Sequence, residues 1–136
     1  MSVFLAVTAI ALSLGLSLEV PAMSERQELT GHWRITWIAD GTLPPDAEVS
    51  LAFTADGRMF GKASCRMYRT EYKLDDDTLS FGEMRFGNER CPSDTLKIEA
   101  DVLRSLRRAN RFQIEQDGSL LLSTFDNPRV RASRAP

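Results

Sequence analysis

Apolar and polar residues alternate along most of the chain beyond residue 30, which is the pattern of β-strands with one buried face. The first such stretch, residues 32–39, places Trp33, Ile35 and Trp37 on the same face. Asp56-Gly57 and Asp117-Gly118 each separate two alternating stretches, which is a strong signal for a β-hairpin. We therefore expect about seven strands, and the pattern allows a further short one at 130–132; the seven lie at residues 32–39, 49–53, 59–65, 69–74, 78–86, 112–116 and 120–125.

A convincing helical period appears in one place, between Ser93 and Ala109. Its acidic start and basic end suit the two ends of the helix dipole. One arc of this helix is apolar and is expected to face the core; it contains Leu96, Ile98, Ala100, Val102, Leu103, Leu106 and Ala109. About seven strands and one helix indicate an α+β fold, either a curved antiparallel sheet or a cracked β-barrel, with the helix packed against it.

Glu99 is the exception on this apolar arc, since it projects between Leu103 and Leu106. A carboxylate in apolar surroundings needs backbone donors or an arginine partner to be tolerated. We therefore expect Glu99 to be a buried structural acid that ties the helix to a loop. An acid/base role in catalysis would need a second carboxylate, and the sequence shows no candidate.

The N-terminal segment has the pattern of a secretory signal peptide. Residues 3–18 are largely apolar and uncharged, and they are shorter than the ~20 residues that cross a bilayer comfortably. Val20-Pro21-Ala22 then offers small residues at a cleavage site, so we expect a signal peptide at residues 1–22. An uncleaved anchor through residues 3–18 is the alternative. Residues 23–28 are polar and predict a flexible segment ahead of a domain at 29–136.

The chain has two cysteines, Cys65 and Cys91. In an exported protein an even number of cysteines favours a disulfide. Two free, buried thiols are the alternative. A metal site built from cysteine alone needs about four ligands, so two cysteines do not support one.

Composition narrows the classes of function. A net charge of −2 excludes a generally basic nucleic-acid binder, and a single histidine argues against histidine-based metal sites and multi-histidine catalysis. That histidine, His32, has no evident orienting acid or nucleophile, and the chain has no Gly-x-Ser-x-Gly element. We therefore expect that the protein is not an enzyme and that it has no catalytic, cofactor-binding or metal-ligating residues.

Two charged clusters have competing interpretations. Arginines at the end of the helix suit an anionic lipid head group or an acidic partner, although a solvated helix face has the same pattern. Asp75-Asp76-Asp77 fits a solvated turn better than a calcium loop, because the glycine and glutamate spacing of an EF-hand is missing. The arginines concerned are Arg104, Arg107, Arg108 and Arg111.

The order of these segments resembles the META domain, also called the HslJ-like family after a bacterial heat-shock protein. The resemblance covers residues 29–125 and rests on an ordered set: Leu29-Thr-Gly-His-Trp33, Leu51-Ala-Phe53, Asp56-Gly-Arg58, Gly61-Lys-Ala-Ser-Cys65, Tyr68 and Tyr72, Cys91, the helix, and Leu120-Leu-Leu122. It implies a cracked-barrel domain of the bacterial envelope, associated with stress or antibiotic tolerance rather than with a known reaction. It implies no catalytic residues.

The chain departs from the family pattern at two places. Arg66 follows the first cysteine, where the family usually has asparagine. The segment before the second cysteine is typically similar to Thr-x-Met-Ala, and here it is Gly87-Asn-Glu-Arg90. Any role that the family assigns to that asparagine therefore does not carry over to this chain.

Together these patterns predict a monomeric, non-enzymatic periplasmic or secreted protein with a binding or stress-tolerance role. Its partner would be an envelope protein or a lipid, not a nucleic acid, and it would meet the membrane only through an uncleaved leader. One alternative is a barrel that binds lipid or a small ligand in an apolar groove under the helix, lined by Leu96, Leu103 and the tryptophans. Another is an inhibitor or chaperone of a secreted protein.

Overall fold

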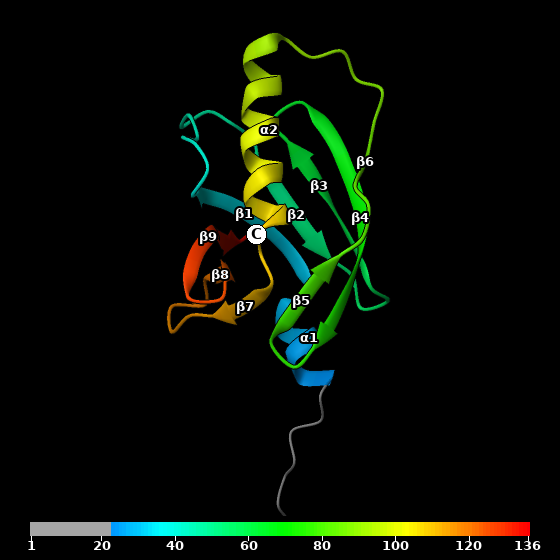
Figure 1. Cartoon of the computed structure of the whole chain (residues 1–136), viewed down its shortest axis with the longest axis vertical. Helices are drawn as coiled ribbons and strands as arrows, with labels where there is room; N and C mark the ends of the chain where they lie inside the picture. Colours follow the sequence, from blue (N-terminus) through cyan, green and yellow to red (C-terminus); the bar gives the residue numbers. More distant parts are fainter. Residues whose placement is uncertain (1–22) are drawn as a thin grey trace, which may run out of the picture.

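The computed structural model describes residues 23–136, so the predicted signal peptide, its cleavage after Ala22 and the alternative anchor at 3–18 lie outside the described residues. Within these residues, two helices and nine strands follow one another (Figure 1). Their bounds are α1 Met23–Leu29, β1 Gly31–Ile38, β2 Ser50–Phe53, β3 Arg58–Ala63, β4 Arg66–Asp75, β5 Thr78–Phe81, β6 Arg85–Phe86, α2 Ser93–Arg107, β7 Arg111–Ile114, β8 Leu120–Thr124 and β9 Asn127–Arg134.

Eight of the strands form a closed antiparallel barrel. Their order is β3-β2-β1-β9-β8-β7-β5-β4, and pairing of β4 with β3 closes the ring, while the short β6 adds to β4 beyond β5. The α+β barrel prediction is therefore confirmed in outline, and the strand count differs. The expected strand at 78–86 is divided into β5 and β6 around residues 82–84, and the short stretch at 130–132 extends into β9, which pairs with β1.

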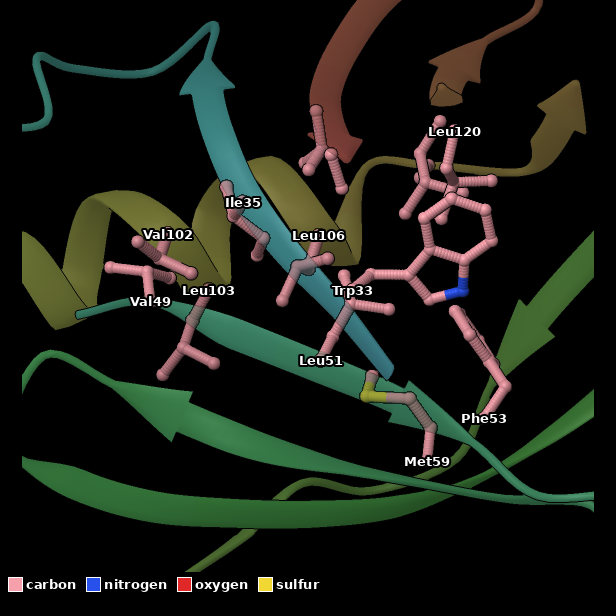
Figure 2. Packing of buried hydrophobic residues seen from close by; sticks show 14 of the residues in the cluster. Trp33, Ile35, Val49, Leu51, Phe53, Met59, Val102, Leu103, Leu106 and Leu120 are labelled. Atoms are coloured by element: carbon pink, nitrogen blue, oxygen red, sulfur yellow. The ribbon is translucent and has the colours of Figure 1, made fainter. Parts of the chain in front are cut away.

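The core fills the barrel and continues beneath α2 (Figure 2). From the strands it takes Trp33, Leu51 and Met59, each no more than 1% exposed, and from α2 it takes Val102 and Leu106, both 0% exposed. Burial of each large apolar side chain contributes roughly 1.5–3 kcal/mol to folding. Because these side chains fill the interior, the barrel is a packed core rather than a container.

Trp37 corrects the expectation that it shares a face with Trp33 and Ile35. The pairing of β1 with β9 shifts register between Ile35 and Trp37, as a β-bulge does, and this extra residue reverses the alternation. Trp37 is therefore 42% exposed, and Ile38 takes the inward position at 2% exposed. A bulge depends on the partner strand, so the alternation within β1 alone could not reveal it.

Residues 23–28, predicted to be a flexible segment, lie in the short helix α1. Its last residue, Leu29, is buried, and the indole nitrogen of Trp33 donates a hydrogen bond to the Leu29 carbonyl oxygen at 2.9 Å. Arg134 of the last strand donates to the backbone oxygens of Glu28 and Thr30 and lies over the Trp33 ring. The end of α1 is therefore held against the barrel by the first and last strands.

Gly61 on β3 lies close against the backbone of β2. A Cβ atom added to Gly61 would lie 2.0 Å from the Ser50 carbonyl oxygen. Tyr68 lies directly opposite Gly61 in the β3–β4 register, and its hydroxyl donates to that same oxygen at 2.7 Å. Only glycine leaves room for this approach of β2 to β3.

Burial of Tyr68 predicts a loss of stability in alkali. Burial raises the pKa of its phenol well above the usual value, so the folded state keeps a proton that the unfolded chain releases near pH 10. Stability is therefore expected to fall above about pH 10, by up to ~1.4 kcal/mol per pH unit from this group, and to be unaffected by it below pH 9. Urea unfolding at pH 8.5, 9.5 and 10.5 measures this dependence.

Tyr68→Phe is the control for this prediction. It removes one hydrogen bond at every pH, and it is expected to flatten the alkaline decline. Part of the decline should remain, because burial also raises the pKa of Tyr72. Equal alkaline slopes in the two proteins would contradict the assignment to Tyr68.

Candidate functional site

Glu99 is buried beneath α2 and is held by Arg66 at the start of β4. Its side chain is 3% exposed, and that of Arg66 is 32% exposed. The Arg66 Nε donates to both carboxylate oxygens at 3.0 Å, and Nη2 donates to Oε1 at 2.7 Å. This fork-shaped contact raises the pKa of Arg66, mainly through the hydrogen bonds to Glu99. The guanidinium also lies 4.7 Å from the centre of the Phe86 ring.

The two cysteines lie beside this ion pair. Cys65 directly precedes Arg66, and Cys91 directly precedes the N-cap residue of α2, Pro92. Their sulfur atoms are 1.96 Å apart, at the distance of a disulfide, and their Cα atoms are 5.9 Å apart. The Arg66–Glu99 pair and the Cys65–Cys91 link therefore attach α2 to the β3–β4 turn at two neighbouring points. This arrangement is structural, because Glu99 is closed to solvent.

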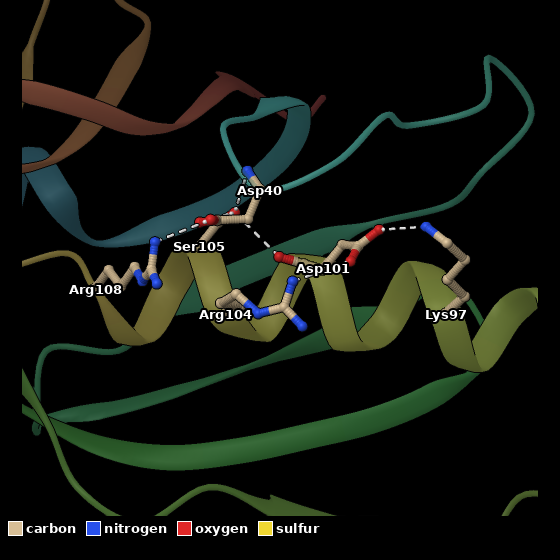
Figure 3. A network of polar contacts seen from close by, with 6 residues as sticks. All are labelled: Asp40, Lys97, Asp101, Arg104, Ser105 and Arg108. Carbon is tan, nitrogen blue, oxygen red and sulfur yellow. Dashed lines mark hydrogen bonds and ion pairs between the residues drawn. The ribbon is translucent and has the colours of Figure 1, made fainter.

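A second polar network attaches the other side of α2 to the loop after β1 (Figure 3). The Asp40 backbone N–H donates to the Ser105 hydroxyl at 3.1 Å, and Arg108 donates to the Asp40 carboxylate at 3.1 Å. A Cβ atom at Gly41 would lie 2.5 Å from an Asp101 carboxylate oxygen, so the loop lies directly on the helix. Ser105 is 0% exposed and therefore cannot meet a substrate. The network comprises Asp40, Lys97, Asp101, Arg104, Ser105 and Arg108.

The predicted cluster of arginines at the end of α2 is largely occupied by contacts within the protein. Arg104 pairs with Asp101 at 3.5 Å, and Arg108 pairs with Asp40 at 3.1 Å. Arg111 lies 5.7 Å from the centre of the Phe125 ring. The cluster therefore does not present four free cations to a ligand.

The predicted apolar groove under the helix is closed. Leu103 is 5% exposed and Trp33 is 0% exposed, so both belong to the core. Leu96 and Trp37, at 40% and 42% exposed, contact solvent instead of lining a groove with them. A ligand site has to be sought on the outside of the barrel.

His32 lies on the outer wall of the barrel. Its ring meets Phe60 edge-on at 6.2 Å, and within residues 23–136 it makes no side-chain hydrogen bond or ion pair. In this same part of the chain, no three histidine, cysteine, aspartate or glutamate side chains converge as metal ligands. Asp76 and Asp77 form the β4–β5 turn, as expected, and Asp75 is the last residue of β4.

A row of side-chain positions crosses the outer wall over five strands. The register pairs one residue with the next from β1 through β2, β3 and β4 to β6, in the order His32, Ala52, Phe60, Arg69 and Arg85. Arg69 and Arg85 are exposed and directly opposite each other on neighbouring strands. This pair could not be singled out from the sequence, because the pairing of β4 with β6 is not visible in the local pattern.

Two grooves meet along this row, and both are lined by Phe60, Arg69 and Arg85. The larger groove, about 720 Å³, is also lined by three acidic side chains, Asp56, Glu71 and Glu83, and by one further basic side chain, Arg58. The smaller groove, about 400 Å³, continues over Met67, Tyr68 and the segment 86–88. Because these two grooves meet there, we take the outer wall around Phe60 as the candidate site.

Comparison with known proteins places the chain in a family. The chain is similar to a protein from Burkholderia xenovorans solved by NMR, with 23% identity over 83% of this chain and 88% of that chain and a TM-score of 0.64. It is also similar to a DUF4847 family protein from Bacteroides vulgatus ATCC 8482, with 15% identity over 82% and 97% of the two chains and a TM-score of 0.55. No curated protein matches the sequence. These likenesses support the fold alone, but the META domain model matches residues 27–136, and the chain therefore belongs to the META domain family.

Proposed function

We propose that this META-domain protein is a non-enzymatic binding protein of the bacterial envelope, and that it binds through the outer wall of the barrel around Phe60. The observation that carries the proposal is the pair of grooves that meet at Phe60, Arg69 and Arg85. Ligand sites combine apolar surface with a few polar groups, and this wall has both. The filled interior supports an outer site over one inside the barrel.

The extracytoplasmic location draws its support from the cysteines and the leader pattern. Cys65 and Cys91 lie at disulfide distance, and disulfides persist in oxidising compartments such as the periplasm. Residues 1–22 have the composition of a signal peptide. Within residues 23–136, neither helix is long and apolar enough to cross a membrane.

Fractionation and intact mass test the location. We expect the full-length chain, expressed in a bacterium, to reach the periplasm as residues 23–136. Its denatured, non-reduced mass should be lower by two hydrogen atoms than that of the dithiol form, because Cys65 and Cys91 are bonded. Full-length protein with two free thiols in the cytoplasm would contradict the proposal.

Photo-crosslinking tests the binding wall. Met67 lines the smaller groove and is 44% exposed, and Leu96 on α2 is 40% exposed but lines neither groove. A photoreactive amino acid at position 67 is expected to give adducts in living cells that are absent or weak with the same amino acid at position 96. Equal labelling at both positions, or labelling at 96 alone, would contradict the assignment of the binding wall. The adduct's mass separates a protein partner, including a client of a chaperone or inhibitor, from a small molecule.

A further inference from the structure

We infer that the smaller groove is an anion site whose occupant is an amphiphilic phosphate. The phosphate would be held by Arg69 and Arg85, and an apolar chain would lie against Phe60 and Met67. This inference rests on the proposed function, because it names the class of ligand for the same wall. The argument depends on the two arginines, on the apolar lining and on the balance of charge between the grooves.

Arg69 and Arg85 occupy an unfavourable arrangement that an anion would relieve. They are directly opposed on β4 and β6, and like charges in this position destabilise a sheet. Within residues 23–136 neither side chain makes an ion pair or hydrogen bond, whereas Arg58 on β3 and Arg66 on β4 each pair with a carboxylate. A guanidinium presents planar donors that match two phosphate oxygens. Two unpartnered guanidiniums at one point therefore favour an oxyanion.

The lining of the smaller groove favours an apolar part on the same ligand. Phe60 and Phe86 line it, and Met67 is 44% exposed there without a covering element. Its volume of about 400 Å³ is within the range of small-molecule sites and exceeds what a free phosphate needs. An alkyl chain can bury itself against these side chains, which inorganic phosphate cannot do.

The distribution of charge selects the smaller groove over the larger one. Three carboxylates line the larger groove, and none of the described residues that line the smaller groove is acidic. One carboxylate does lie nearby, because that of Glu89 packs against Gly87 at the edge of the smaller groove. The negative charge of Glu89 repels an anion in the groove. Removal of this charge is therefore expected to strengthen binding, whereas removal of either arginine is expected to weaken it.

Titration of purified residues 23–136 with hexyl phosphate, followed by two-dimensional NMR, tests the site. We expect chemical-shift changes centred on the amides of Met67, Gly87 and Asn88. Hexyl phosphate should bind at least tenfold more tightly than inorganic phosphate, because two buried methylene groups contribute about that factor. It should also bind at least tenfold more tightly than hexyl glucoside, because the glucoside has no negative charge for the two arginines to hold. If inorganic phosphate bound as tightly as hexyl phosphate, the inference of an amphiphilic ligand would be overturned and a free phosphate would be identified as the occupant. No shifts at these amides would overturn the site.

Substitutions test the role of each charge. Arg69→Gln and Arg85→Gln are each expected to weaken hexyl phosphate binding roughly tenfold, the factor of one lost charge-assisted hydrogen bond. Arg107→Gln on α2 changes the net charge equally outside both grooves and should leave the affinity unchanged. Glu89→Gln should strengthen binding. An equal loss in Arg107→Gln, or no loss in the two groove variants, would overturn the inference.

Two further comparisons separate weaker binding from unfolding, and the anion site from the proposed function. Arg69→Gln removes a like-charge pair, so its thermal midpoint should be unchanged or higher, and weaker binding cannot then be attributed to unfolding. Crosslinks at position 67 without hexyl phosphate binding would overturn the phosphate ligand and leave the binding wall standing. Hexyl phosphate binding without crosslinks in cells would overturn the proposed role and leave the anion site standing.

Discussion

Arg66→Met is expected to lower the free energy of unfolding by about 3 kcal/mol, an effect set by the Glu99 carboxylate that it leaves without a partner. Removal of one member of a buried ion pair typically costs about 3–5 kcal/mol, because the other charge stays in apolar surroundings. Here the Glu99 side chain is 3% exposed, among the core residues of α2. The partial exposure of Arg66, 32%, places the expected cost at the lower end. Urea unfolding at pH 7 measures it.

Two further proteins separate this mechanism from a general effect of losing an arginine. Arg58→Met removes an exposed guanidinium that pairs with Asp56 at 3.6 Å, and exposed pairs of this kind contribute little, so its unfolding midpoint should scarcely change. Arg66→Met/Glu99→Leu replaces both charges by apolar groups and is expected to recover most of the loss, as in other buried pairs. If Arg66→Met alone were as stable as the parent protein, Glu99 would have another donor or access to water.

The sequence predicted the elements that depend on local signals. The two Asp-Gly pairs form the β2–β3 and β7–β8 turns, where Gly57 and Gly118 adopt positive φ angles of 91° and 87° that favour glycine. The helix predicted at 93–109 is α2, which ends at Arg107, and the later part of its apolar arc, Val102, Leu103 and Leu106, faces the core, whereas Leu96 and Ala100 are exposed. These features follow from neighbouring residues, so a single chain is enough to reveal them.

The features that the sequence missed depend on partners distant in the chain. Closure of the barrel requires β9 to pair with β1, about a hundred residues earlier, and the bulge that exposes Trp37 arises in that same pairing. The candidate site has the same origin, because Arg69 and Arg85 meet only through the register of β4 with the two-residue strand β6. For Glu99 the sequence indicated the need for a partner without identifying Arg66, which is 33 positions away.

Loss of the Cys65–Cys91 link is expected to have an effect of similar size through a different mechanism. The two cysteines are separated by 26 positions, and opening a loop of this length costs about 3.5 kcal/mol on the chain-entropy model. For a domain of this size such a loss lowers the thermal midpoint by on the order of 10–15 °C. We therefore expect Cys65→Ser/Cys91→Ser to remain folded at 25 °C with a midpoint lower by that amount.

Reductant provides the matched test of this mechanism. Dithiothreitol should lower the midpoint of the parent protein to nearly that of Cys65→Ser/Cys91→Ser and should leave the variant unchanged. A shift in both proteins would contradict an effect of the disulfide. The Arg66–Glu99 pair does not involve the thiols and still holds α2 to β4, so the reduced protein should unfold in one cooperative transition.

Reduction together with Arg66→Met removes both attachments of α2 to the β3–β4 turn, and because the two sites are adjacent their effects need not add. A combined loss smaller than the sum would mean that each attachment positions the other, and a larger loss would mean that either one alone suffices to hold α2.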